Sequence, residues 1–307
     1  MSVTDMKGNP MRIFITGASG WIGSAVTAEL LDRGHEVVGL ARNDESAARL
    51  VAAGASAHPG SLTDLDSLRA GAESADGVIH LGFVHDFSDY AGAGRTERAA
   101  VSAFGEVLAG TGKPLLIASG LAGFEPGRPV TEVDPTGNTA PESPRGGSEH
   151  LTLGFADSGV RALAARFAPT VHGMGDHGFV AELARVAREK GVAAYVGDGS
   201  NRWPAVHRTD AARMVALGFE SAPAGTRLHA VGEEGIPTKR IAEALGASLG
   251  VPVVSVSPED APAHFGWIGM FFGADMTATS TITRELLDWA PTGPTLLEDI
   301  AAGAYPA

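Results

Sequence analysis

Three glycines near the start of the chain stand at the spacing of a turn that can hold phosphate groups. Gly17, Gly20 and Gly23 form a GxxGxxG pattern within Thr16–Gly23. In such a turn one glycine allows the tight bend, one lets backbone approach a diphosphate, and one lets a helix pack on a strand. The N-terminus of that helix then faces the phosphates with its dipole and free N–H groups. We therefore predict a dinucleotide site that includes Gly17, Ser19, Gly20, Trp21, Ile22 and Gly23.

The end of the second predicted strand indicates which dinucleotide fits. An NAD site usually carries an acid about 20 residues after the glycines, where it binds the ribose 2′-hydroxyl. This chain has Arg42 there, and a guanidinium suits a 2′-phosphate and stacks on adenine. Arg42 therefore favours NADP, with NAD as the less favoured cofactor. Two alternatives stay open: Arg42 is an ordinary surface arginine, or Asp44 and Glu45 weaken the preference unless they are first-turn acids of the next helix.

Two loops carry a histidine beside an aspartate and could supply a proton. His85 and Asp86 follow the fourth predicted strand, and Asp176 and His177 follow the sixth. Histidine titrates near neutrality, which suits a general acid or base. Ligands of parallel α/β sheets bind beyond the carboxyl ends of the strands, where both loops should lie. The competing interpretation is structural: Asp86 or Ser88 caps the helix after the first loop, and Asp176 caps the helix after the second.

Other kinds of site are excluded or unsupported by the residue types. The chain has no cysteine, which rules out disulfides, thiolate nucleophiles and cysteine zinc sites. The pairs His80/His85 and His172/His177 lack the HExxH spacing, so we expect no metal. The GxSxG at 246–250 lies in a helical pattern and not at a strand-to-helix turn, so we interpret it as chance.

The totals narrow the class of protein and its partners. The chain has 307 residues, 44% of them hydrophobic, which suits a globular protein. Its 23 basic and 36 acidic residues give a net charge of −13, which argues against nucleic acid or an anionic membrane as the main partner. Residues 1–10 lack the apolar stretch of a signal peptide, and no membrane span is visible. We expect a cytoplasmic protein that acts on a small molecule.

The elements that must position these residues alternate between strands and helices. Apolar runs predict strands at 11–16, 35–41, 57–62, 77–81, 115–118 and 160–167. Helical patterns fill the intervals, the longest at about 88–109 and 145–157. This alternation predicts an α/β fold with a Rossmann-type, doubly wound parallel sheet.

The second half of the chain is less regular. We expect residues 11–170 to form the dinucleotide-binding domain, rejoined by a strand at 227–231, and 171–307 to form a smaller C-terminal substrate lobe. Residues 119–144 are rich in Pro, Gly and Thr and suit an active-site loop. Trp203 and the aromatic residues between Phe265 and Phe272 either line an apolar pocket or form ordinary core, and we favour core.

At this point the chain resembles the extended short-chain dehydrogenase/reductase family, which includes the NAD-dependent epimerases and dehydratases. The motifs that carry the resemblance are TGASGWIG at 16–23, SLTD at 61–64, VIHLG at 78–82, IAS at 117–119, RFAPTVHG at 166–173 and VHRTDA at 206–211. The resemblance implies further cofactor contacts from Ser61, Leu62, Leu81, Gly82, Phe83, Ser119, Arg145 and Pro169. It also implies a catalytic role for Ser119, a structural place for His172, and a homodimer formed through the two long helices.

The chain departs from the family at the proton relay. The family uses a tyrosine followed four residues later by a lysine, which lowers the pKa of the phenol and binds the nicotinamide ribose. Here Pro141 stands in the tyrosine position and Arg145 in the lysine position. A guanidinium can bind ribose oxygens but does not give up a proton. The catalytic serine is also displaced, because Gly120 falls where the hydroxyl is expected.

Two hypotheses of different class follow. The first is an NADP-dependent oxidoreductase that reduces a small or medium organic carbonyl or imine, with His85, His177 or water as proton source. An iminium substrate arrives protonated and would need no strong acid. The second is a non-catalytic NADP-binding redox sensor. A sugar epimerase or dehydratase ranks lower, because that chemistry needs the missing base.

Overall fold

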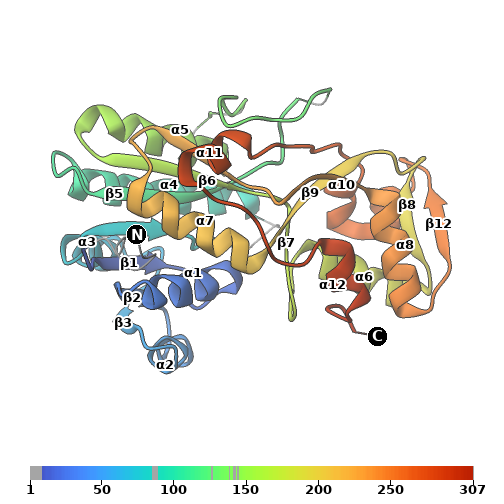
Figure 1. Ribbon diagram of the computed structural model, residues 1–307, viewed down its shortest axis with the longest axis horizontal. Coiled ribbons are helices and arrows are strands. Elements are labelled where there is room, and N and C mark those ends of the chain that lie inside the picture. Colours follow the sequence, from blue (N-terminus) through green and yellow to red (C-terminus); the bar gives the residue numbers. More distant parts are fainter. Residues whose placement is uncertain are drawn as a thin grey trace, which may run out of the picture.

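The computed structural model describes residues 9–84, 89–125, 127–137, 139–140, 143 and 145–306. Seven parallel strands form its central sheet, in the order β10-β6-β5-β4-β1-β2-β3 (Figure 1). The strands are β1 (Arg12–Thr16), β2 (Glu36–Ala41), β3 (Ser56–Pro59), β4 (Gly77–His80), β5 (Pro114–Gly120), β6 (Arg161–Phe167) and β10 (Thr226–Ala230). The strand order reverses between β1 and β4, and in such sheets ligands bind at this switch point.

Side chains of the strands alternate between two cores, as expected for a sheet buried on both faces. Ile13 and Ile15 face one core, together with residues of α1 (Trp21–Asp32) and α7 (Arg208–Ser221). Phe14 faces the other, against α3 (Leu65–Glu73), α4 (Tyr90–Leu108) and α5 (Gly146–Gly154). Helix α2 (Asp44–Ala52) lies near β3, and α5 continues as a 3-10 turn over Phe155–Ser158. The prediction of a doubly wound α/β fold is confirmed.

A second, smaller body lies at one end of the sheet (Figure 1). It contains two further sheets, in the orders β11-β9-β7 and β12-β8. The strands are β7 (Thr170–His172), β8 (Ala193–Val196), β9 (Arg202–His207), β11 (Glu233–Pro237) and β12 (Val253–Val256). The helices are α6 (Phe179–Lys190), α8 (Thr238–Leu249), α9 (Ala261–Phe265), α10 (Gly269–Phe272) and α12 (Leu296–Ala301), while α11 (Thr281–Leu287) packs beside β10 and α7.

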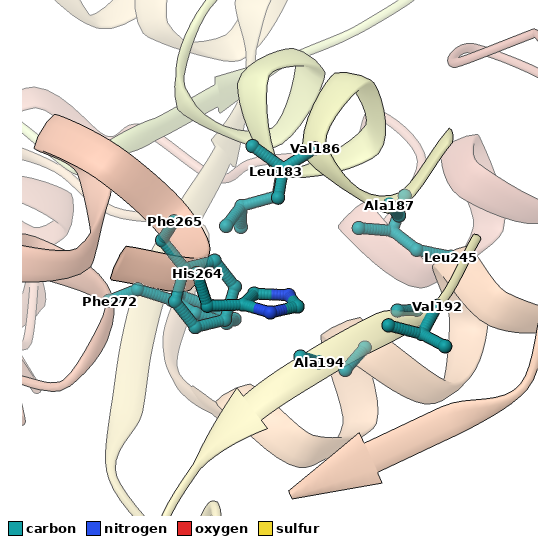
Figure 2. Close-up of a pocket in the computed structure, with 11 residues that line it drawn as sticks. Leu183, Val186, Ala187, Val192, Ala194, Leu245, His264, Phe265 and Phe272 are labelled. Atoms are coloured by element: carbon teal, nitrogen blue, oxygen red, sulfur yellow. The ribbon is translucent and has the colours of Figure 1, made fainter. Parts of the chain in front are cut away.

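The core of this lobe is aromatic. Trp203, Phe265 and Phe272 are buried in it, whereas Trp267 and Phe271 are half-buried. The expectation that these aromatics form core is therefore met for the first three. A cavity lies beside them, and Figure 2 shows residues that line it, His264 among them. Its volume is about 10 Å³, and His264 is the one polar side chain among the lining residues. That volume holds one water molecule at most, so the cavity is a packing defect and not a substrate pocket.

Three strands of the lobe, β7, β11 and β12, escaped prediction. Strand β7 has three residues and follows β6 almost directly, so it adds no separate apolar run. Strand β11 has the sequence EEGIP and shifts register between Glu233 and Ile236. Among the described residues no helix has the length and apolarity to cross a membrane.

Candidate functional site

The glycine turn between β1 and α1 is closely packed against the end of β4. Gly17 has a φ of +71°, and a Cβ there would lie 2.7 Å from the amide nitrogen of Gly82. A Cβ at Gly23 would lie 2.0 Å from the carbonyl oxygen of Gly17, so any side chain would push the helix off the turn. Gly20 donates its N–H to the Gly17 oxygen at 2.9 Å. The glycines therefore bring the start of α1 close to the switch point between β1 and β4.

The N-terminus of α1 has the features of an anion-binding helix end. Its N-cap is Gly20, which makes no side-chain cap bond, and the first turn contains no acid. The first intrahelical bond runs from Ser24 N to Gly20 O, which leaves the N–H groups of Trp21, Ile22 and Gly23 available. By contrast, side chains of Asn43 and Asp64 cap α2 and α3. An uncapped, acid-free first turn fits the diphosphate of a dinucleotide.

The ends of β2 and β3 carry Arg42 and Ser61, which were predicted to contact the cofactor. Arg42 directly follows β2, is exposed, and makes no ion pair or hydrogen bond with any described residue. Asp44 and Glu45 lie in the first turn of α2, and Glu45 faces Arg49 at 3.7 Å. These acids therefore have a helical role, and Arg42 stays available for a ligand. Ser61, after β3, bonds the hydroxyl of Thr63 at 3.0 Å.

The end of β4 contacts the glycine turn through a buried hydrogen-bonded group. Thr16 Oγ1 accepts the N–H of Gly82 at 3.1 Å and lies 2.6 Å from His80 Nδ1. Burial, with a smaller contribution from Arg145, lowers the pKa of His80 to about 3. His80 is therefore neutral and fixes the turn at Leu81–Gly82, where the side chain of Leu62 also packs. The sequence places His80 in the VIHLG motif and in a histidine pair, but it does not reveal this bond to Thr16.

Ser119, at the end of β5, is held by a buried carboxylate. Its Oγ donates to Glu149 Oε2 at 2.7 Å. Glu149 also accepts two bonds from Arg166, at 2.5 and 2.9 Å, and one from Arg227 at 3.1 Å. Burial alone would raise the pKa of Glu149, but these donors outweigh it and lower the pKa. We call Ser119, Glu149, Arg166 and Arg227 the α5 network.

Arg145 lies where the ends of β4 and β5 meet α4. Its Nη1 donates to Glu97 at 2.9 Å and to the Ala118 carbonyl at 3.2 Å, and its guanidinium stacks over the Phe83 ring at 4.1 Å. Glu97 is buried, and burial raises its pKa against the opposing influence of Arg145. The tyrosine-position residue, Pro141, lies outside the described residues. Arg145 can bind an oxygen atom of a ligand but holds no transferable proton.

Of the two predicted His–Asp pairs, only Asp176 and His177 lie in the described part of the chain. His85 and Asp86 lie outside the described residues. His177 is exposed, and its ring lies edge-on to Trp21 at 5.5 Å, which places it against the glycine turn. Asp176 accepts bonds from Gly178 N and from the Tyr305 hydroxyl, the latter at 2.6 Å. The alternative of Asp176 as N-cap is wrong, since α6 is capped by Gly178 without a side-chain bond.

Three other residues named from the sequence can be placed. His172 is buried, as expected, and its Nδ1 lies 2.6 Å from Asp299. Pro169 is half-buried in the link between β6 and β7. Ser248 of the GxSxG pattern is inside helix α8, so the interpretation of chance holds. Within the described ranges no group of three or more histidine or acidic side chains could hold a metal ion.

Comparison with known proteins identifies a family and several relatives of this chain. A model of the NAD dependent epimerase/dehydratase family matches residues 13–230. An uncharacterised protein of Schizosaccharomyces pombe is 50% identical over 96% of this chain and 100% of its own length. A 2-alkyl-3-oxoalkanoate reductase of Stenotrophomonas maltophilia is 27% identical over 80% of this chain and 77% of its own.

Among solved structures, a dTDP-glucose 4,6-dehydratase of Streptomyces venezuelae with NAD bound superposes with a TM-score of 0.77. It shares 19% identity and covers 96% of each chain. At that identity the similarity concerns the fold alone.

Proposed function

The chain belongs to the NAD dependent epimerase/dehydratase family, and from that premise we propose that it is an NADPH-dependent reductase of a small or medium organic carbonyl or imine. The observation that carries the proposal is the contrast between an available cofactor site and a missing proton relay. Arg42 and the first turn of α1 offer donors that no described residue binds, whereas Arg145, in the lysine position, is bonded to Glu97. Two distant relatives are named as reductases, of a 3-oxoalkanoate and of a quinoline oxide.

In this proposal the residues of the site bind the cofactor and orient the substrate. When bound, NADPH supplies a hydride to the carbon of the C=O or C=N group, and a proton must reach the heteroatom. The first-turn N–H groups of α1 bind the diphosphate, and Arg42 binds the 2′-phosphate. Arg145, held beside Phe83 and Ala118, offers its remaining N–H donors to a ribose or substrate oxygen.

The proton has three sources in this proposal: His177, His85 or water. His177 is exposed beside Trp21 and can exchange protons with solvent. Ser119 is a poor source, because its hydroxyl hydrogen is bound by the Glu149 carboxylate. An iminium ion needs only the hydride, so a chain without a strong acid suits imines better than ketones.

The test is NADPH oxidation with matched pairs of cyclic imines and cyclic ketones of the same ring. We expect turnover with some members, and faster turnover of an imine than of its ketone. Background rates with every member, in protein that binds NADPH, would contradict the reductase and favour the second candidate. That candidate is a non-catalytic NADP-binding redox sensor, and the fully paired α5 network is the observation in its favour.

The cofactor choice, the homodimer and the cytoplasmic location stay proposals alongside it. The expected dimer would use α4 and α5, which pack together on one face of the sheet. Light scattering of the purified chain would show a mass near twice 31.4 kDa if the dimer forms.

A further inference from the structure

One cation beside the glycine turn has no acidic partner among the described residues. Arg208 begins α7, and its Nη2 donates to Ser24 Oγ of α1 at 2.5 Å. Its guanidinium lies 4.2 Å over the ring of Trp21. Among the described residues it makes no other hydrogen bond and no ion pair, and its Nε is buried without a partner. One of five N–H donors is therefore used.

Four other arginines show how unusual this is. Arg213, one turn and a half further along α7, bonds Asp210 at 3.0 Å. Arg202 faces Asp275 at 3.4 Å, and Arg185 binds Glu182 and Glu189. Arg161 has no carboxylate partner in the described part of the chain, but it donates to two carbonyls at the end of α7. Arg208 alone of these five is half-buried with its charge unbalanced and most donors free.

A half-buried guanidinium without an anion is costly unless a ligand supplies the anion. Burial lowers the pKa of Arg208, which is the sign of an uncompensated charge. Arg208 contacts Trp21 and Ser24, which belong to the first turn of α1, and the first three N–H groups of that turn have no partner among the described residues. The five-donor fork of arginine suits two phosphate oxygens at once.

We infer that Arg208 binds the diphosphate of the dinucleotide, with Trp21 and Ser24 as positioning residues that hold its guanidinium beside the N-terminus of α1. This inference rests on the proposed function, because it assumes that the glycine turn binds a dinucleotide. It adds a contact that the glycine pattern does not predict. It also assigns different phosphates to two arginines: the diphosphate to Arg208 and the 2′-phosphate to Arg42.

The experiment separates the two phosphates with fragments of the cofactor. ADP carries the diphosphate, and 2′-AMP carries the 2′-phosphate without it. Binding of each fragment, of NADPH and of NADH is measured by calorimetry on the full chain carrying Arg208→Met, Arg42→Ala or neither. Methionine keeps an apolar side chain over Trp21 while removing the charge. Arg240→Met is the matched control, since Arg240 is an exposed arginine on α8 that faces Glu243 at 3.6 Å.

We expect Arg208→Met to weaken ADP, NADH and NADPH by about 10- to 100-fold, the range of a lost charged hydrogen bond, and to leave 2′-AMP within about twofold. Arg42→Ala should weaken binding of 2′-AMP and leave binding of ADP unchanged. Arg240→Met should change the affinity for neither fragment. Ser24→Ala should give a smaller loss than Arg208→Met, of the same pattern.

Three results would overturn the inference. One is an Arg208→Met protein that melts earlier but binds ADP and NADH as the unaltered chain does, which would make Arg208 only a tie between α7 and α1. Another is an Arg208→Met protein whose affinities for ADP and for 2′-AMP fall by the same factor. The third is loss of a phosphate-bearing substrate with unchanged cofactor binding, which would assign Arg208 to a substrate phosphate. If the unaltered chain binds neither dinucleotide, the proposed function itself fails, a result distinct from all three.

Discussion

Two regions at the same edge of the central sheet treat their polar groups in opposite ways. In the glycine-turn region, comprising Gly17–Ser24 with Arg42 and Arg208, most donors have no partner among the described residues. In the α5 network, each charged group has a partner inside the protein. Unpaired donors are retained where a ligand completes them, while paired and buried groups hold a structure. The glycine-turn region therefore has donors open to a ligand, whereas Ser119, for which the family resemblance implies a catalytic role, is held in a static network.

If the α5 network is structural, breaking it should lower stability without changing ligand binding. Glu149→Ala leaves the buried Arg166 without its carboxylate, which should lower the free energy of unfolding by about 3–5 kcal/mol. Urea unfolding measures this, and NADPH affinity at low urea should change little. Glu189→Ala, on an exposed ion pair with Arg185, is the control and should change stability by less than about 1 kcal/mol. A loss as small as the control's in the Glu149 variant would show that the network is not structural.

The glycine-turn region should respond in the opposite way. Arg42→Ala removes an exposed side chain with no partner in the described part of the chain, so stability should stay unchanged. NADPH affinity should fall by about 10- to 100-fold, because the 2′-phosphate loses its charged donor. NADH affinity should stay within about twofold. Fluorescence titration checks both, with Arg49→Ala on α2 as control; equal losses for the two dinucleotides would contradict the assignment.

His80, which is hydrogen-bonded to Thr16 beside the glycine turn, should affect the pH dependence of stability. Burial and then Arg145 lower its pKa from 6.5 to about 3, so the unfolded chain binds a proton more readily than the folded one. Stability from this group is therefore full above about pH 6.5 and falls as pH drops towards 3. Between about pH 8 and pH 5 we expect a loss of about 2 kcal/mol that His80→Gln abolishes. Parallel stability curves for the two proteins would refute this.

The smallest effect is expected at Ser119. Ser119→Ala removes one of four donors to Glu149 and should lower stability by about 1 kcal/mol. Turnover of any substrate found should change by less than about threefold. A general acid would instead contribute about 10²- to 10⁴-fold. A loss of that size would return Ser119 to the catalytic role that the family resemblance implies.

Features that local sequence patterns determine could be predicted. Features that depend on contacts between distant segments could not. Alternating apolar runs and the glycine spacing were sufficient for the parallel sheet and the turn before α1, because these are local patterns. The short β7 and the irregular β11 exist only through pairing with β9, so no run of residues predicts them.

Site residues follow the same division. Arg42 could be named because it directly follows a predicted strand. Arg208 could not, because its meaning depends on Trp21 and Ser24, which lie 184 or more residues earlier in the chain. The binding of Ser119 by Glu149 was equally hidden, since 30 residues separate them and only the packing of α5 on β5 joins them.

The central claim is that the glycine-turn region is a working NADPH site. Titration of the purified chain with NADPH and with NADH, followed by nicotinamide fluorescence, tests it most directly. We predict saturable binding of both, with NADPH at least about tenfold tighter because of its 2′-phosphate. Tighter binding of NADH would contradict the role of Arg42, and binding of neither would contradict the account as a whole.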